Sequence, residues 1–285
     1  MKFPQFLMHS MISFSTCWLP LYGLDQYPSS EEASLYHHHS QQQWSVAYEA
    51  LNNVSFQGDE RVLDIGCGSG KVTANIAGRV LKGSVLGLDL SQGMIEFAQK
   101  KYLPFYKNLS FTKGDVLEFT SPSQFDFIFS SNSLHWILDH QSLLNKVYDL
   151  LSDDGTILFT IPCPPFPDVA AVFQEVTSQD IWKDYLKNYN HPRRKFTSEE
   201  YTLLLKQAGF NKIEVTQVPF TYFFETKREL ADWYAGFSPM LSYIPKEMCE
   251  SFLINIVERY IQSFPLDETG RVVFKQNELI IKAQK

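Results

Sequence analysis

The fold of this chain is indicated most clearly by the segment Val62-Leu63-Asp64-Ile65-Gly66-Cys67-Gly68-Ser69-Gly70. Residues 61–65 read as a buried strand, and residues 71–80 have the apolar periodicity of a helix. Closely spaced glycines between a strand and a helix are typical of nucleotide-binding α/β proteins, because glycine accepts positive φ angles and lets a ligand approach the backbone. The segment therefore predicts a ligand site at this turn.

Strands and helices alternate on either side of this segment. The predicted strands cover residues 61–65, 84–88, 109–113, 125–130 and 156–161, and the predicted helices cover residues 42–53, 71–80, 92–101 and 143–151. This alternation predicts an α/β fold, a parallel sheet with helices on both faces. Ligands of such sheets bind beyond the carboxyl ends of the strands.

The pattern changes after residue 161. Two further strands, over residues 213–218 and 271–282, complete a Rossmann-like seven-stranded sheet. One mostly helical stretch runs to about residue 208, and a second runs from residue 227 to residue 264. We expect residues of about 163–195 and 219–265 to form a helical cap over the site within one domain of residues 27–285. Residues 1–26 are predicted to be an N-terminal extension, because polar residues and prolines interrupt their apolar run and argue against an export signal.

The glycine spacing and one acidic residue indicate which ligand binds. Gly66, Gly68 and Gly70 follow a G-x-G-x-G pattern, whereas dinucleotide sites use G-x-G-x-x-G. Asp64 stands two positions before the first glycine, where a carboxylate would repel a pyrophosphate but attract the ammonium of an amino acid. The segment therefore favours a methyl donor with a methionine moiety, S-adenosylmethionine, over a dinucleotide.

Later strand ends supply the remaining candidate cofactor residues. Asp89 ends the second strand, where a carboxylate can accept both ribose hydroxyls. Met94 could pack on the adenine or belong to the core. Asp115 could accept the adenine amine while the Val116 amide reaches a ring nitrogen, although a turn aspartate is the alternative. Ser130, at the end of the fourth strand, is small enough to leave room for the transferred methyl.

These segments together resemble class I S-adenosylmethionine-dependent methyltransferases. A wider resemblance covers about residues 30–285. It rests on Tyr36-x-x-x-Ser40-x-x-Gln43-x-x-x-Ala47, on Ser133-Leu134-His135-Trp136 and on residues 264–270. These are similar to carboxylate O-methyltransferases, a group with trans-aconitate, malonyl-carrier-protein and juvenile hormone acid methyltransferases. The resemblance implies methyl transfer to a carboxylate on a small molecule or on a carrier-protein-bound acyl group.

The same resemblance implies roles for two residues outside the glycine segment. Gln43 and Trp136 would hold the acceptor carboxylate with N–H donors. His135 could assist or be structural, and Arg193 and Arg194 could pair with a second acidic group or form a solvated loop. Two alternatives stay open. One is an amine, phenol or carbon acceptor, which needs a base; the other is a cofactor-binding protein without catalytic activity.

Composition disfavours several other classes. A net charge of −7 opposes binding to nucleic acid, and no apolar run approaches the ~20 residues of a membrane span. Four dispersed cysteines predict reduced thiols and a cytoplasmic location. No metal site is expected, because the adjacent side chains of residues 37–39 point in different directions. The aromatic share of 15% fits a Phe-rich core or an aromatic-lined pocket.

Overall fold

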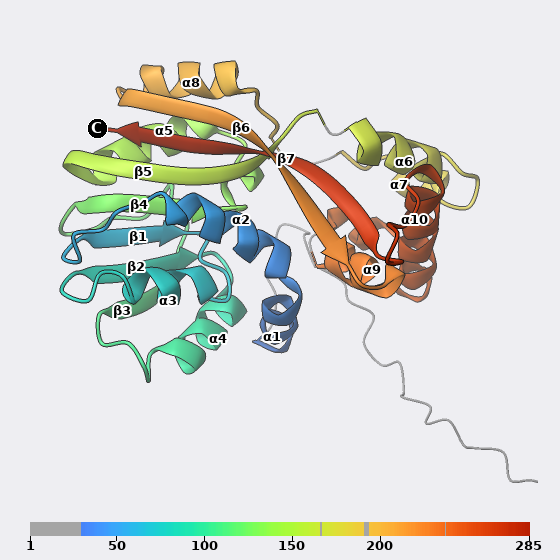
Figure 1. The fold of residues 1–285 in the computed structure, drawn as a ribbon, viewed down its shortest axis with the longest axis horizontal. Helices are drawn as coiled ribbons and strands as arrows, with labels where there is room; N and C mark the ends of the chain where they lie inside the picture. Colours follow the sequence, from blue (N-terminus) through green and yellow to red (C-terminus); the bar gives the residue numbers. More distant parts are fainter. Residues whose placement is uncertain (1–29, 166, 191–193, 237) are drawn as a thin grey trace, which may run out of the picture.

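The computed structural model describes residues 30–165, 167–190, 194–236 and 238–285 (Figure 1). The predicted extension over residues 1–26 and the candidate Arg193 lie outside these ranges. The predicted α/β fold is confirmed, since the described chain forms a seven-stranded sheet in the order β3-β2-β1-β4-β5-β7-β6. The strands β1 to β5 pair in parallel, and β7 runs antiparallel to both of its neighbours.

The strands alternate with helices as the sequence predicts. The strands are β1 Arg61–Ile65, β2 Ser84–Asp89, β3 Leu109–Lys113, β4 Phe125–Ser131, β5 Leu151–Cys163, β6 Asn211–Phe224 and β7 Val272–Gln284. The α-helices are α1 Ser30–His39, α2 Gln41–Asn52, α3 Lys71–Ala77, α4 Gln92–Tyr102, α5 His140–Leu150, α6 Pro167–Thr177, α7 Lys183–Leu186, α8 Ser198–Gln207, α9 Lys227–Ala235 and α10 Cys249–Ser263. The 3₁₀ turns are η1 Leu134–Trp136, η2 Pro239–Tyr243 and η3 Lys246–Met248.

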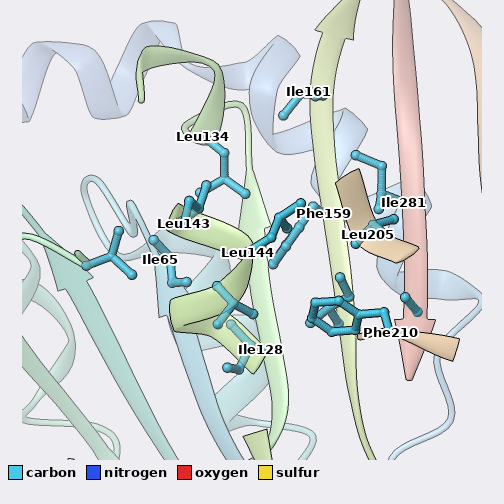
Figure 2. Close-up of a cluster of buried hydrophobic side chains, with 14 of the residues drawn as sticks. Ile65, Ile128, Leu134, Leu143, Leu144, Phe159, Ile161, Leu205, Phe210 and Ile281 are labelled. Atoms are coloured by element: carbon cyan, nitrogen blue, oxygen red, sulfur yellow. The ribbon is translucent and has the colours of Figure 1, made fainter. Parts of the chain in front are cut away.

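The central strands β1, β4 and β5 are buried on both faces, whereas the edge strand β3 is buried on one face only. Successive side chains of a strand point to opposite faces, so each of these central strands contributes to two cores. In β4, Ile128 packs with α5 and α8 on one face, whereas Phe127 and Phe129 pack with α2, α3 and α4 on the other. Figure 2 shows the first of these cores, where Ile128, Leu144 and Phe159 meet between β4, β5 and α5. Burial on both faces explains the continuous apolar runs of these strands.

A third hydrophobic cluster, here called the cap core, lies beyond the sheet. It is built from α6, α7, α9 and α10 together with the last residues of β6 and the first residues of β7. Figure 1 shows that β6 and β7 run out of the sheet and into this helical part. The parallel strands point their carboxyl ends toward the same side, so the cap faces the edge where ligands of such sheets bind.

The strand β6 is longer than predicted. The predicted strand ends at residue 218, directly before Pro219, which has no N–H group to donate. In the structure β6 continues to Phe224, and Pro219 pairs with Asn277 of β7. Since β6 is the edge strand of the sheet, its outer side has no neighbour that needs the missing N–H. Residues 219–224 are therefore strand and not helix, and Phe220, Tyr222 and Phe224 pack in the cap core from this strand end.

The helix α2 belongs to two cores at once. Val46 packs in the cap core, whereas Ala47 and Leu51 pack against the sheet beside α3. The preceding helix α1 contacts α2, α4 and α9, and Figure 1 places it at the carboxyl edge of the sheet, next to the cap. The segment before β1 thus joins the sheet to the cap above the predicted ligand site. Within the described ranges no helix combines the length and apolarity needed to cross a membrane.

Truncating one buried leucine should test the core in Figure 2. Leu144 of α5 is fully buried, whereas Leu203 of α8 is 58% exposed. We expect Leu144→Ala to lower the free energy of unfolding by about 2–5 kcal/mol, because it removes apolar contacts and leaves a cavity. Leu203→Ala should change it by less than about 0.5 kcal/mol. Urea unfolding of both variants measures the difference, and equal effects would contradict the assigned packing.

Candidate functional site

The glycine loop after β1 has a left-handed backbone at each predicted glycine. Gly66, Gly68 and Gly70 have φ angles of 70°, 52° and 77°. The N–H groups of Gly66 and Cys67 donate to the carbonyl of Leu88, at 2.7 and 3.1 Å. These bonds hold the loop against the end of β2. The loop therefore turns sharply at the carboxyl edge of the sheet and leads directly into α3.

Two of the glycines are also required by close packing. A Cβ atom on Gly66 would lie 1.8 Å from the Oγ atom of Ser133, which follows β4. A Cβ atom on Gly70 would lie 2.8 Å from both the Ala98 side chain and the Phe111 ring. The turn after β1 is thus pressed against the turn after β4. These two turns flank the point where the strand order reverses, which is the usual ligand site of such sheets.

Asp64 is a buried carboxylate at the end of β1. It is 2% exposed, and its Oδ2 atom accepts a hydrogen bond of 2.7 Å from the hydroxyl of Thr73. Burial raises the pKa of Asp64 to about 7, Thr73 opposes this rise, and the charge of Asp89 adds to it. Asp64 forms no ion pair with the described cationic side chains. A buried carboxylate without a cationic partner suits the ammonium group of a ligand.

Asp89 is held at the end of β2 by two backbone groups. Its Oδ2 atom accepts from the N–H of Gly68 at 2.8 Å, and its Oδ1 atom accepts from the N–H of Ser91 at 2.9 Å. Burial raises the pKa of Asp89, and these two bonds oppose the rise. Each carboxylate oxygen has a second lone pair. The fixed carboxylate therefore keeps acceptor capacity for the hydroxyl pair of a ribose.

The remaining candidate cofactor residues differ in their surroundings. Ser130 is fully buried, and its hydroxyl donates to the carbonyl of Ile65 at 2.7 Å, so this group ties β4 to β1. Asp115 is exposed and its Oδ1 atom accepts from the backbone of the second following residue, as in the alternative of a turn aspartate. Met94 and Val116 are both buried. Contacts of these four residues with a cofactor stay predictions.

The helix α1 covers the glycine loop, which the sequence did not predict. The Nδ1 atom of His37 lies 3.0 Å from the Oγ atom of Ser69, and its ring packs 5.2 Å from the ring of Phe97. Burial and the positive charges of Lys101 and Lys71 lower the pKa of His37 to about 4. The imidazole is therefore neutral near pH 7 and forms part of the cover of the loop.

The candidate acceptor residue Gln43 is anchored to the cap. Its Oε1 atom lies 3.3 Å from the Nε1 atom of Trp233 in α9. An indole N–H can only donate, so the amide atom that faces it must be the oxygen. The amide nitrogen of Gln43 consequently points away from Trp233. The bond connects α2 to the cap at the edge of the sheet where the glycine loop lies.

The other acceptor candidates lie on the turn η1 after β4. His135 is 4% exposed, and its ring lies 5.3 Å from the ring of the half-buried Trp136. The carbonyl of His135 accepts a hydrogen bond of 2.8 Å from the N–H of Arg194. Arg194 itself is exposed, with its guanidinium 5.2 Å from the ring centroid of Phe196. The backbone of Arg194 thus supports η1.

A buried histidine holds the same turn from the α5 side. The Nε2 atom of His140 lies 3.0 Å from the carbonyl of Leu134, and its Nδ1 atom lies 3.2 Å from the hydroxyl of Tyr201. A carbonyl only accepts, so Nε2 carries the proton and Nδ1 accepts from the tyrosine. Burial lowers the pKa of His140 to about 4. His140 is therefore a neutral structural residue that fixes the position of η1.

Comparison with known sequences connects this geometry to methyl transfer. A family model described as a methyltransferase domain matches residues 62–155. A trans-aconitate 2-methyltransferase of Acidovorax sp. (strain JS42) is 24% identical over 258 residues, which cover 89% of this chain and 98% of that protein. A trans-aconitate 2-methyltransferase of Shigella flexneri is 26% identical over 256 residues, covering 88% of this chain and 97% of its own.

Comparison with solved structures confirms the fold. The YcgJ protein of Bacillus subtilis superposes with a TM-score of 0.58 at 18% identity, over 87% of this chain and 98% of its own. Phosphoethanolamine N-methyltransferase 2 of Haemonchus contortus has a TM-score of 0.60 at 18% identity, over 90% of this chain and 57% of its own. That enzyme was crystallised with S-adenosylhomocysteine and a phosphorylated amine.

Replacing Gly66 by alanine should destabilise the fold and weaken ligand binding more than replacing Gly270 by alanine. Gly66 and Gly270 both have positive φ, but a Cβ atom on Gly270 would meet nothing within 4 Å. Alanine should cost about 1–2 kcal/mol of unfolding free energy at either position, because of its backbone conformation. Gly66→Ala should cost clearly more and abolish measurable binding of S-adenosylhomocysteine, since it also displaces Ser133. Urea unfolding and calorimetry test this, and equal losses in the two variants would refute it.

Cofactor affinity should depend on pH through Asp64. The ionised carboxylate favours the ligand's ammonium, and its pKa is about 7 without ligand. Affinity for S-adenosylhomocysteine should therefore rise by up to ~10-fold per pH unit below pH 7 and level off above it. Thr73→Val removes a hydrogen bond that lowers this pKa, so the midpoint should move upward. Calorimetry across this pH range provides the measurement.

Asp64→Asn serves as the control for this pH dependence. It should flatten the profile, since the asparagine side chain does not titrate. The unliganded protein should show the opposite trend in stability. A carboxyl with a raised pKa in the folded state holds its proton more tightly there, so its contribution to stability is lost as the pH rises toward 7. An unchanged affinity profile in Asp64→Asn would rule out this residue as the titrating group.

Proposed function

Since this chain is a class I S-adenosylmethionine-dependent methyltransferase, we propose that it methylates a carboxylate oxygen on a small molecule or on a carrier-protein-bound acyl group. One observation carries the proposal. The similarity to trans-aconitate 2-methyltransferases covers nearly their whole length. It therefore includes α2 and the cap as well as the strands that would bind the cofactor. A likeness limited to the glycine loop would leave the acceptor open.

The cofactor would be held by the carboxyl edge of β1 and β2. S-adenosylmethionine supplies a methyl group already activated by its positive sulfur. Asp64 would bind the ammonium of the methionine moiety, because this buried carboxylate has no described cationic partner. Asp89, fixed by the N–H groups of Gly68 and Ser91, would accept the ribose hydroxyls. The left-handed loop allows this close approach.

A carboxylate acceptor needs no catalytic base from the protein. It is ionised and nucleophilic at neutral pH, so its oxygen can attack the methyl group without a base, giving a neutral ester and S-adenosylhomocysteine. The protein must align the two groups and exclude water. Gln43 would present its amide nitrogen to the carboxylate, since Trp233 holds the amide oxygen. Trp136, on the turn held by His140, would supply a second N–H donor.

The cap and the cellular setting belong to the same proposal. Residues about 163–195 and 219–265 would close the acceptor side of a single domain, with β6 providing residues 219–224. We place the protein in the cytoplasm, because Cys67, Cys163 and Cys249 are buried free thiols. The net charge of −7 argues for a small or carrier-bound acid over nucleic acid.

A transfer screen should separate acid acceptors from the alternatives. Methyl transfer from radiolabelled S-adenosylmethionine would be followed over di- and tricarboxylic acids, fatty acids and a malonyl carrier protein, with amines and phenols in parallel. We expect transfer to at least one acid, and we expect mild base to release the label as methanol, because a methyl ester hydrolyses. A base-stable product formed on an amine or a phenol would overturn the proposed function.

Substitutions in α2 should separate acceptor positioning from cofactor binding. Gln43→Leu should lower kcat/KM for the acid by about 10-fold to 100-fold, because it removes a donor to an anionic oxygen. Trp233→Phe should have a smaller effect in the same direction, since Gln43 stays in place and loses the bond that orients it. Gln41→Leu, an exposed change on the same helix, is the control. Loss of cofactor affinity in Gln43→Leu, measured by calorimetry, would contradict the assignment.

A further inference from the structure

We propose that Asn132 is a further acceptor-binding residue whose side-chain amide donates a hydrogen bond to the carboxylate that receives the methyl group. The proposal rests on the proposed function for the chemistry of the acceptor. It assigns the contact to a residue that neither the glycine motif nor the resemblance identifies. Three independent features of Asn132 support it: its position in the sheet, its backbone conformation and the state of its amide nitrogen.

Asn132 stands at the point where the strand order reverses. It directly follows β4, which lies beside β1, and β1 leads on to β2 and β3 on its other side. Its N–H donates to the carbonyl of Thr160 in β5 at 2.9 Å, and the next residue, Ser133, packs against Gly66. Asn132 therefore lies between the glycine loop, where the cofactor would bind, and β5, whose far end leads into the cap.

The backbone of Asn132 is left-handed. Its φ angle is 51°, a conformation that costs an ordinary residue about 1–2 kcal/mol and that asparagine adopts more readily than most. Residues held in such conformations tend to cluster at active sites and ligand-binding positions. At this strand end a glycine would meet the backbone requirement with less strain. The presence of asparagine at this position, in place of glycine, is therefore explained by a role of its side chain.

The amide nitrogen of Asn132 supplies that reason. Its Nδ2 atom is buried and has no hydrogen-bond partner within the described chain. The two preceding hydroxyls are already engaged, since Ser130 donates to Ile65 and Ser131 bonds to Thr160 at 2.7 Å. A buried donor left unsatisfied costs about 1–3 kcal/mol. A carboxylate oxygen would remove this cost and form a charge-assisted bond, which is stronger than a bond between neutral groups.

The position of Asn132, its backbone conformation and its unsatisfied amide nitrogen together favour a contact with the acceptor over a contact with the cofactor. The groups suited to the cofactor, Asp64 and Asp89, lie on β1 and β2, and both are acidic. Asn132 lies on the opposite side of the glycine loop, toward β5, on the same turn region as Trp136. Gln43, Trp136 and Asn132 would then surround the acceptor carboxylate with N–H donors from α2, η1 and the end of β4.

The test compares two variants with the acid identified by the transfer screen. Asn132→Asp keeps the shape of the side chain but replaces the donor by a negative charge, so kcat/KM should fall by ~100-fold or more. Asn132→Gly removes the donor without charge and should lower kcat/KM by ~10-fold, with its fold intact because glycine accepts positive φ. Asn145→Asp, at an exposed position of α5, is the matched control for the charge and should leave kcat/KM unchanged.

Calorimetry with S-adenosylhomocysteine separates the acceptor contact from the other roles. Both Asn132 variants should bind it within ~2-fold of the unaltered protein. A loss of affinity that parallels the loss of kcat/KM would assign the amide to the cofactor and overturn the proposal. Unchanged kcat/KM in Asn132→Gly would also overturn it. If the acceptor proves to be an amine, the proposed function fails, and Asn132→Asp should then retain more activity than Asn132→Gly.

A binding measurement keeps the proposal testable without turnover. The side-chain NH₂ signals of asparagine can be followed by NMR in the complex with S-adenosylhomocysteine, and the signal missing in Asn132→Asp belongs to Asn132. Titration with acetate, the smallest stable carboxylate probe, should shift this signal at concentrations where chloride does not. A shift confined to acetate supports a carboxylate contact at Asn132. An unmoved signal, or equal shifts with both anions, would refute it.

Discussion

The close approach of two turns, Gly66 after β1 and Ser133 after β4, is the constraint on which the site depends. A single methyl group on Gly66 would overlap the Ser133 side chain. The contact is possible because the loop is left-handed at Gly66, and Ser130 ties the same two strands together from within. This packing brings the proposed cofactor residues on β1 and β2 beside the proposed acceptor residues on β4 and η1.

Two carboxyl groups lie beside the place where the turns after β1 and β4 meet, here called the junction. Burial raises the pKa of both Asp64 and Asp89, which means that the unliganded fold holds two carboxyl groups in an unfavourable setting. Such groups are retained when a ligand compensates them, and the binding free energy then adds to the stability of the folded state. The neutral histidines His37 and His140 contribute structure on either side of the junction without adding charge.

Local sequence predicted the parallel half of the fold well, because its central strands are buried on both faces and its helices have clear periodicity. The strand over residues 61–65 has the predicted bounds, and α4 begins at the predicted residue 92. The length of β6 escaped prediction, since the tolerance for Pro219 depends on its being at the sheet edge. Contacts between distant segments, such as His37 with Ser69 and Gln43 with Trp233, leave no local pattern. The unsatisfied nitrogen of Asn132 is likewise visible only in the folded chain.

In the proposed function, Asp64 recognises the amino acid part of the methyl donor. Calorimetry of S-adenosylhomocysteine and of methylthioadenosine, which lacks that part, tests it in the unaltered protein and in Asp64→Asn. Removing the amino acid part should weaken binding by at least ~10-fold more in the unaltered protein than in the variant, as expected for losing a bond to a charged group. Equal losses in the two proteins would contradict it.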